Sequence, residues 1–228
     1  MKRIPLSHTM NTRDLGGYPA RDGKITSYAR ILRSDAPFVL SAEDAELLKQ
    51  LNVTAAIDFR SKPEIERNPS AFELSPDFNY FHCPFAIGNR DPGSKDGVPA
   101  LYGEIISDFP AIGRIMRIIA GQKGAVLIHC AVGKDRTGVV AALLLLAAGV
   151  GMSDILADYQ VSYTYIRHLI RETRKKNPEL PDYYGRSDME NMEKTLIQFK
   201  EDYHTIDEYL GKLNLTTNEQ LTIKNKLF

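Results

Sequence analysis

The sequence predicts an α/β fold, with a central, mostly parallel sheet flanked by helices and a helical C-terminal half. Three patterns support this prediction. Before residue 150, short runs typical of strands are interleaved with segments of helical periodicity. After residue 150, only helical patterns remain. At the end of the first part, an apolar run at 125–128 is followed by a polar loop and then by unbroken apolar sequence at 139–148. The last segment suits a buried helix.

Each expected element follows from a local pattern. Strands are rich in β-branched and aromatic residues, whereas Ser, Thr, Pro and Gly mark helix ends and turns. The first half predicts strands at 24–33, 53–59, 78–84 and 125–128, helices at 42–52, 63–67, 100–108, 111–121 and 139–148, and loops at 11–19 and 87–99. The second half predicts helices at 154–162, 163–176, 188–203, 206–213 and 218–227, with Ser153, Ser187 and Thr217 as N-caps.

The chain of 228 residues is expected to form a single domain, 1–228, with an α/β core at 1–150 and a helical part at 151–228 that could act as a lid. Because 29 Lys plus Arg balance 29 Asp plus Glu, no global field favours nucleic acid or an anionic membrane. Two cysteines are too few for a secreted disulfide framework, and no segment has the pattern of a secretory signal or membrane span. We therefore expect a cytoplasmic protein without nucleic-acid partners or stable membrane insertion, although secretion as an effector stays open.

Residues 129–138, His-Cys-Ala-Val-Gly-Lys-Asp-Arg-Thr-Gly, carry the expected chemistry. Cys130 ends the strand and faces the N-terminus of the next helix, whose dipole favours a thiolate nucleophile. Gly133 permits a tight turn, and the planar fork of Arg136 can hold two phosphoryl oxygens. We expect Thr137 to donate a hydrogen bond to the Cys130 sulfur, which helps the thiolate leave from a phospho-enzyme.

A strand, a tight loop and a helix N-terminus together are typical of an anion site. We predict a phosphate-binding loop made of Ala131, Val132, Gly133, Lys134, Asp135, Arg136 and Thr137. A lone cysteine at a strand end is more often a buried apolar residue, but its spacing to the arginine makes this site specific. The nucleotide P-loop pattern fails, because position 128 is Ile and position 135 is Asp.

The segment 129–138 resembles the signature of cysteine-dependent protein-tyrosine phosphatases, in an atypical bacterial branch whose members act on phosphoproteins and often on phosphoinositides. Further matches to that branch lie at 11–18, 33–35, 58–61 and 153–162, so the resemblance covers roughly residues 4 to 215. It implies a protein-tyrosine-phosphatase-like sheet flanked by helices, no metal and no cofactor. It also implies a phosphorylated protein or phosphoinositide as substrate.

The proton donor for the leaving group is open at this point. Many tyrosine phosphatases carry the acid on a Trp-Pro-Asp loop, but this chain has no tryptophan. Asp135 lies in the phosphate-binding loop, as in the similar bacterial enzymes, and Asp58 ends a predicted strand. Asp91 and Asp96, on the loop after the strand at 78–84, are further candidates. The expected catalytic residues are therefore Cys130, Arg136, Asp135 and Asp58.

Two other features have a functional and a structural interpretation. The segment 167–176 carries five basic residues against one acidic residue, so it is either a solvated helix face or a lid that steers anionic substrates. Cys83 ends a predicted strand. If that strand neighbours the strand of Cys130, a reversible disulfide could protect the nucleophile; otherwise Cys83 is an inert core thiol.

These patterns predict a metal-independent phosphomonoesterase that hydrolyses phosphotyrosine, with phosphoserine, phosphothreonine and phosphoinositides as further substrates. Lys134 adds a second charge to the loop, which suits a ligand with more than one phosphate. An enzyme acting mainly on phosphoinositides is the first alternative. A non-catalytic phosphate-binding module is the second, although binding alone does not need the thiol. A sulfur-transfer or arsenate-reducing enzyme is weaker, because only Cys83 could serve as a resolving cysteine.

Overall fold

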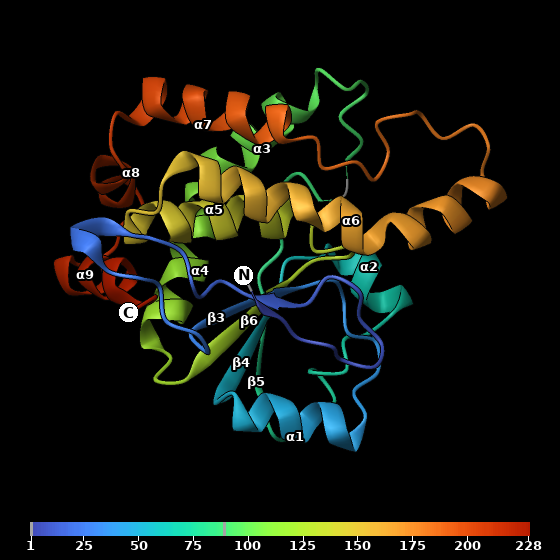
Figure 1. The fold of residues 1–228 in the computed structure, drawn as a ribbon, viewed down its shortest axis with the longest axis horizontal. Coiled ribbons are helices and arrows are strands. Elements are labelled where there is room, and N and C mark those ends of the chain that lie inside the picture. The colour runs from blue at the N-terminus through green and yellow to red at the C-terminus, as the bar shows by residue number, and fades with distance from the viewer. Residues whose placement is uncertain (1, 89) are drawn as a thin grey trace.

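The computed structural model describes residues 2–88 and 90–228 and has a six-stranded sheet with helices on both faces (Figure 1). The sheet order is β1-β2-β3-β6-β4-β5. The strands are β1 (Lys2–Arg3), β2 (Arg13–Asp14), β3 (Ile31–Ser34), β4 (Val53–Asp58), β5 (Asn79–His82) and β6 (Ala125–His129). The four strands β3, β6, β4 and β5 are parallel, whereas β1 and β2 add an antiparallel edge. The predicted α/β class with a mostly parallel sheet is confirmed.

The helices lie near their predicted positions. They are α1 (Ala42–Gln50), α2 (Lys62–Arg67), α3 (Val98–Ser107), α4 (Phe109–Gly121), α5 (Arg136–Ala148), α6 (Met152–Lys176), α7 (Met189–Tyr203), α8 (Ile206–Lys212) and α9 (Thr217–Asn225). The two helices predicted at 154–176 form the single helix α6, which starts one residue before Ser153, with Gly151 as its N-cap. Asp188, not Ser187, precedes α7, because the Ser187 hydroxyl accepts from Tyr163 N and donates to Gln160 O. The cap predicted at Thr217 is one residue off, because Thr216 caps α9 and its side chain accepts from Glu219 N.

The edge strands β1 and β2 were not predicted, and of the predicted segment 24–33 only residues 31–33 lie in a strand, β3. Two-residue strands are too short to show the alternation that identifies a strand in sequence. Arg13 on β2 lies opposite Arg33 on β3, and like charges in such a pair destabilise a sheet. The pairing of these two strands must therefore be stabilised by contacts that their side chains make with other elements.

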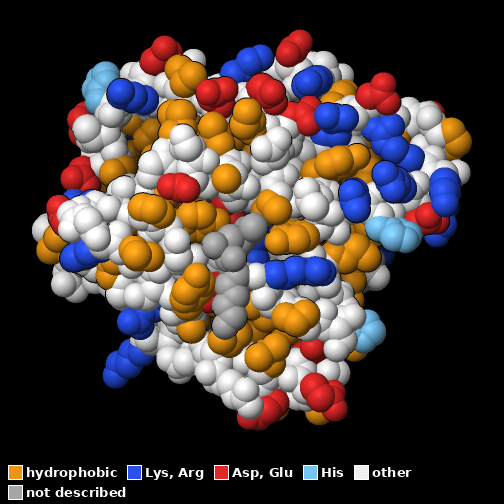
Figure 2. Space-filling model, in the orientation of Figure 1, with side chains coloured by type: hydrophobic (Ala, Val, Ile, Leu, Met, Phe, Trp, Pro, Cys, Tyr) orange, Lys and Arg blue, Asp and Glu red, His pale blue; other side chains and the backbone are white. Residues whose placement is uncertain are grey.

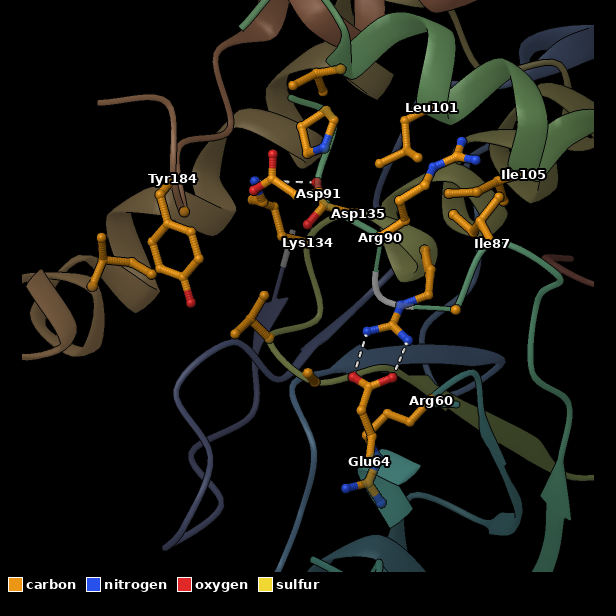
Figure 3. Close-up of a pocket in the computed structure, with 18 of the residues that line it drawn as sticks. Arg60, Glu64, Ile87, Arg90, Asp91, Leu101, Ile105, Lys134, Asp135 and Tyr184 are labelled. Atoms are coloured by element: carbon orange, nitrogen blue, oxygen red, sulfur yellow. Dashed lines mark hydrogen bonds and ion pairs between the residues drawn. The ribbon is translucent and has the colours of Figure 1, made fainter. Parts of the chain in front are cut away.

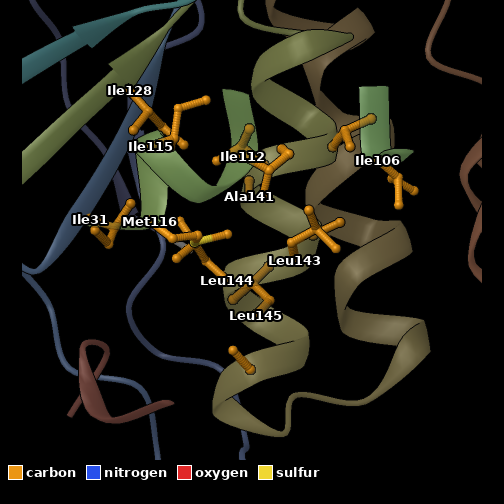
Figure 4. Packing of buried hydrophobic residues seen from close by; sticks show 14 of the residues in the cluster. Ile31, Ile106, Ile112, Ile115, Met116, Ile128, Ala141, Leu143, Leu144 and Leu145 are labelled. Carbon is orange, nitrogen blue, oxygen red and sulfur yellow. The ribbon is translucent and has the colours of Figure 1, made fainter. Parts of the chain in front are cut away.

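Successive side chains of β6 point to opposite faces of the sheet and therefore join two different hydrophobic clusters. Val126 and Ile128 face a large cluster built with α3 to α9, whereas Ala125 and Leu127 face a smaller cluster that includes residues of α1. Figure 4 shows the large cluster where α4 and α5 meet the sheet. Nearly every side chain of α5 is buried, which explains the unbroken apolar sequence after the polar loop.

The register of the sheet fixes the location of the polar loop. Asp58 pairs with His129 and with His82, so β4, β6 and β5 end together. In parallel sheets, ligands bind outside the carboxyl ends of the strands. The chain therefore enters the loop 130–135 at the edge of the sheet where a binding site is expected. Within the described part of the chain, we find no helix with the length and apolarity that crossing a membrane requires.

Candidate active site

The loop between β6 and α5 is held from behind by its carbonyl groups. Asn11 Nδ2 donates to Val132 O at 2.9 Å and to Gly133 O at 3.1 Å. Arg33 Nη2 donates to Gly133 O at 2.7 Å. Because the C=O and N–H of a trans peptide point in opposite directions, anchoring these carbonyls turns the N–H groups of residues 133 and 134 to the other side. The loop is thereby prepared to bind an anion with its backbone.

A buried ionic network positions the two anchoring side chains. Asp158, on α6, forms ion pairs with Arg13 at 2.9 Å and Arg33 at 2.5 Å. Arg13 also donates to Asn11 O at 3.0 Å. Burial opposes the charged form of Asp158, but the two guanidinium groups hold its pKa at about 2. The segment near residue 11 therefore supports the loop rather than touching the substrate side.

Gly133 is the pivot of the loop, with φ +67°. A Cβ at this position would lie 2.6 Å from Asp35 N and closer still to the Ser34 carbonyl oxygen. The close approach of the loop to the end of β3 thus requires glycine for its backbone conformation and for space. The predicted role of Gly133 as the turn residue agrees with this geometry.

Cys130 follows the last residue of β6 and is 1% exposed. Thr137, in the first turn of α5, is completely buried, but its Oγ1 has no hydrogen-bond partner among the described residues. The predicted bond from Thr137 to the Cys130 sulfur is therefore not formed: the hydroxyl lies within the first turn of α5 with its bonding capacity unused.

Arg136 is bound by a residue that sequence reasoning missed. Its Nη1 donates to Glu64 Oε2 at 2.8 Å and its Nη2 donates to Glu64 Oε1 at 2.9 Å. Burial lowers the pKa of Arg136, but Glu64 and the nearby Cys130 outweigh burial and raise it. Arg136 is thus a permanent cation with a fixed orientation. The sequence signal that could have identified Glu64 is the Ser-Lys-Pro-Glu run at 61–64, shortly after β4. This run is a capping box that starts α2 at the same edge of the sheet.

Asp135 and Lys134 form the second charged pair of the loop. Lys134 Nζ lies 3.1 Å from Asp135 Oδ1 and also donates to Arg186 O at 2.6 Å. The Tyr102 hydroxyl, from α3, donates to the same Asp135 oxygen. The Asp135 side chain is 33% exposed, so it is supported from one side and open on the other. Tyr102 was also not predicted, since nothing in its local sequence distinguishes it from a core tyrosine.

Asp58 does not reach the cavity. It is fully buried, and its carboxylate accepts hydrogen bonds from Arg60 Nη2 at 2.6 Å and from the Tyr80 hydroxyl at 3.0 Å. Burial opposes its ionisation, yet neighbouring His129 and Arg60 keep its pKa below the usual value. A buried carboxylate that is held by these partners and does not line the cavity cannot reach a substrate bound there. This placement speaks against the predicted catalytic role of Asp58 and favours a role in holding Arg60 through a buried ion pair.

A cavity of about 440 Å³ opens beside the loop. Figure 3 shows Tyr184 on one side of this cavity and Ile87, Leu101 and Ile105 on the opposite side, with Asp135 between them. Its lining includes the loop residues Ala131, Val132, Lys134, Asp135 and Arg136, whereas Cys130, Gly133 and Thr137 are buried and are not part of the lining. Apolar walls beside charged loop residues suit a ligand with one anionic group and an apolar body.

The two other candidate acids lie at the edge of the cavity or beyond it. Asp91 lines the cavity, but its Oδ1 accepts hydrogen bonds from the Tyr183 hydroxyl at 2.8 Å and from Gly93 N at 2.6 Å. This contact joins the loop before α3 to the loop after α6. Asp96 lies 3.9 Å from Lys194 on the surface and does not line the cavity. Among the four carboxylates, the structure brings Asp135 closest to the loop chemistry.

Cys83 cannot pair with Cys130 in this fold, because β4 lies between β5 and β6. Neighbouring strands are about 4.8 Å apart, so residues two strands apart are separated by about 10 Å, beyond the roughly 7 Å that a disulfide allows between Cα atoms. Burial also raises the pKa of Cys83 to about 11. The condition for a protective disulfide is not met, and the structure supports the alternative of an inert core thiol.

The basic residues of α6 do not line the cavity. Figure 2 shows Lys and Arg side chains gathered over the outer end of α6, at the right of the view. Ile170 lines the cavity, but no basic residue of the segment 167–176 does. Arg174 pairs with Asp182, and Lys175 pairs with Glu172. The cavity wall from the helical part thus consists of Ile170 and of the loop residues Tyr183, Tyr184 and Gly185.

No cluster of three or more His, Cys, Asp or Glu side chains among residues 2–88 and 90–228 has the arrangement of a metal site. Several charged groups around the cavity are instead paired with each other, such as Arg136 with Glu64 and Lys134 with Asp135. The chemistry available at the loop is that of one thiol, one fixed guanidinium, inward N–H groups and one partly exposed carboxyl group.

Comparison with known proteins gives a consistent assignment. A relative from Cupriavidus necator, provisionally named a tyrosine-protein phosphatase, is 36% identical over 163 residues, which cover 65% of this chain and 59% of that protein. The tyrosine-protein phosphatase of Nostoc commune is 33% identical over 135 residues, which cover 56% of this chain and 46% of that protein. The matched regions thus span about half the length of these relatives.

Similarity to solved structures is weaker. The core catalytic domain of the PP-IP phosphatase Siw14 from S. cerevisiae covers 79% of this chain with 16% identity and a TM-score of 0.40, and 98% of that domain is matched. By contrast, the sequence model of the tyrosine phosphatase family matches residues 4–228. Because this match spans nearly the whole sequence, including the loop that bears Cys130 and Arg136, the chain belongs to the tyrosine phosphatase family.

Proposed function

We propose that this protein is a phosphotyrosine phosphatase that works through a cysteinyl-phosphate intermediate and without a metal ion. The observation that carries the proposal is the loop 130–136, in which anchored carbonyls turn N–H groups toward one side and Arg136 is fixed by Glu64. The Cys130 thiolate attacks phosphorus in line with the leaving oxygen. The N–H groups and Arg136 stabilise the charge on the equatorial oxygens.

Arg136 keeps hydrogen-bond capacity for the phosphoryl group. Glu64 accepts from Nη1 and Nη2, and Phe59 O accepts from Nη1 at 3.3 Å. The Nε–H and the second hydrogen of Nη2 have no protein acceptor among the described residues, and they form one edge of the planar fork. This edge suits a bidentate contact with two phosphoryl oxygens.

Asp135 is the proposed proton donor. It is the partly exposed carboxyl group of the loop, whereas Asp58 is buried and ionised against Arg60. In the first step the P–O bond breaks and the leaving oxygen takes the Asp135 proton. In the second step Asp135 takes a proton from water, which attacks phosphorus and releases the Cys130 thiolate.

The cavity favours a phosphorylated aromatic ring as the substrate. Tyr184 and the aliphatic side chains across the cavity can contact both faces of a ring, which a phosphoserine lacks. A phosphoinositide is the second candidate, because Arg67, Arg90 and Lys134 also line the cavity. Two of these cations already form ion pairs, Arg90 with Glu104 and Lys134 with Asp135. This pairing supports phosphotyrosine over a phosphoinositide as the substrate.

The deciding experiment measures phosphate release from a phosphotyrosine peptide, a phosphoserine peptide and a phosphoinositide panel, with and without EDTA. We expect the phosphotyrosine peptide to have the highest kcat/KM, EDTA to have no effect, and Cys130→Ser to abolish turnover. Activity that needs a metal, or that survives Cys130→Ser, would overturn the mechanism. Tight binding of the phosphopeptide by the wild type without turnover would support a non-catalytic binding module instead.

A further inference from the structure

The Asp135 carboxylate is held by only one of its two oxygens. Oδ1 accepts a hydrogen bond from the Tyr102 hydroxyl and lies 3.1 Å from Lys134 Nζ. Oδ2 has no hydrogen-bond partner among the residues that the structure describes. Because Asp135 lines the cavity and its side chain is 33% exposed, the free oxygen is the one available to a bound substrate.

Tyr102 is itself oriented by a second buried phenol. It lies on α3 with no exposed surface, and its hydroxyl is 2.7 Å from the hydroxyl of Tyr159 on α6. Tyr102 has a single hydroxyl hydrogen, which it gives to Asp135, so Tyr159 must donate to Tyr102. The hydrogen bonds therefore run in one direction, from Tyr159 through Tyr102 to Asp135.

Both phenols keep their protons over the range in which an enzyme works. Burial raises the pKa of Tyr102 well above its usual value, and the charge of Asp135 adds to this effect. Burial likewise raises the pKa of Tyr159. The two rings pack edge to face, with centroids 6.0 Å apart, which leaves neither ring free to turn away. The pair is a fixed hydrogen-bond donor aimed at one oxygen of Asp135.

We propose that Tyr102 is a positioning residue for proton transfer by Asp135, and that Tyr159 orients Tyr102. The inference rests on the proposed phosphatase function. When the S–P bond forms, the P–O bond breaks with its electron pair on the leaving oxygen, and this oxygen takes the proton from Asp135 Oδ2. The Tyr102 bond to Oδ1 prevents rotation of the carboxyl group and stabilises the carboxylate that the transfer produces.

The leaving group of the substrate reports on this role. Phenyl phosphate releases a basic phenolate that needs a proton in the transition state, whereas 2,4-dinitrophenyl phosphate releases a stable anion that does not. A residue that only stabilises the fold affects both substrates equally. Because Asp135 also acts in the second step, which both substrates share, the comparison uses kcat/KM, which covers the steps up to P–O cleavage. A residue that positions the acid lowers kcat/KM for the first substrate and spares the second.

The test compares four variants on these two substrates: Tyr102→Phe, Tyr159→Phe, Asp135→Asn and, as a matched control, Tyr209→Phe. Tyr209 is also a buried tyrosine, and its hydroxyl donates to Ile106 O at 2.7 Å, away from the loop. For Tyr102→Phe we expect kcat/KM on phenyl phosphate to fall about tenfold, with kcat/KM on the dinitrophenyl ester nearly unchanged. Tyr159→Phe should show a smaller loss with the same selectivity. Asp135→Asn should show a larger one, and Tyr209→Phe none.

The outcomes separate this inference from the proposed function. An equal loss on both substrates for Tyr102→Phe, or no loss on either, overturns the positioning role. If Asp135→Asn is selective and Tyr102→Phe is not, only the inference fails. If the wild type hydrolyses neither substrate, or Cys130→Ser retains activity, the proposed function itself fails.

Discussion

Arg136 and Glu64 are joined by two parallel hydrogen bonds of 2.8 and 2.9 Å between the guanidinium and carboxylate groups. The carboxylate is in turn fixed by the start of α2, because Ser61 N and Ser61 Oγ each donate to it at 2.8 Å. The cap of α2 therefore orients Arg136, the arginine that we propose to bind phosphate. The fork is held in place before a substrate arrives, which reduces the entropy lost on binding.

Glu64→Gln should lower the catalytic rate. The amide removes the charge that faces Arg136 and offers only one acceptor oxygen, so the guanidinium loses its fixed plane. We expect kcat/KM on a phosphotyrosine peptide to fall about tenfold or more, measured by steady-state kinetics. Glu66→Gln is the matched control, because Glu66 lies on the same helix, is exposed and pairs with Lys62 at 3.7 Å. Equal kinetics in the two variants would contradict the orienting role of Glu64.

The same ion pair makes stability depend on acid pH. Burial opposes ionisation of Glu64, but Arg136 lowers its pKa from 4.5 to about 2. A lowered folded-state pKa means that the stabilisation is fully present above the unfolded value and is lost as pH falls through the folded value. Between pH 6 and pH 3, urea unfolding should show a loss of about 2 kcal/mol from this group in the wild type and not in Glu64→Gln. Parallel losses in both proteins would refute this account.

Gly133→Ala should damage the loop through space as well as backbone strain. The added Cβ would meet the end of β3 at Ser34 and Asp35. Gly23→Ala is a close control, because Gly23 has φ +68° but no heavy atom lies within 4 Å of the place that its Cβ would take. We expect Gly23→Ala to cost about 1 kcal/mol and to keep activity, whereas Gly133→Ala should cost more and lose most activity. Urea unfolding and kinetic assays would measure both effects, and equal behaviour of the two variants would show that the close approach is unimportant.

Oxidation should not join the two cysteines. With β4 between their strands, Cys83 is too far from Cys130 to form a disulfide without rearrangement of the sheet. After peroxide treatment, mass spectrometry should find oxidised Cys130 and no crosslink to Cys83. Cys83→Ala should lose activity in peroxide at the same rate as the wild type. Detection of the crosslink would mean that this edge of the sheet opens in solution.

Charge removal on α6 should spare small phosphotyrosine substrates. Arg171, Lys175 and Lys176 are exposed and lie outside the cavity lining. At physiological salt, charges separated by more than about 8 Å of solvent are largely screened. The triple change of these residues to Gln should therefore alter kcat/KM on a short phosphotyrosine peptide by less than about threefold. A much larger loss, or an altered salt dependence, would support the lid that the basic segment suggested.

The sequence alone predicted the fold class and the two loop residues, Cys130 and Arg136, at which we expect the chemistry. Apolar runs, helical periodicity and the spacing from Cys130 to Arg136 are local patterns, which can be recognised without knowledge of the fold. The turn at Gly133 was also predictable, because only glycine takes this conformation without strain. The edge strands were not, since β1 and β2 have two residues each and carry no periodic pattern.

The tertiary structure decided which polar groups act together at the loop. Glu64 is 72 residues from Arg136, and Tyr102 is 33 residues from Asp135, so no local pattern connects these pairs. The strand order, too, is invisible in the sequence, and it separates Cys83 from Cys130. Burial likewise distinguishes the candidate acids, because whether a carboxylate keeps a proton depends on the charges and solvent around it. These relationships arise only when distant segments pack against one another.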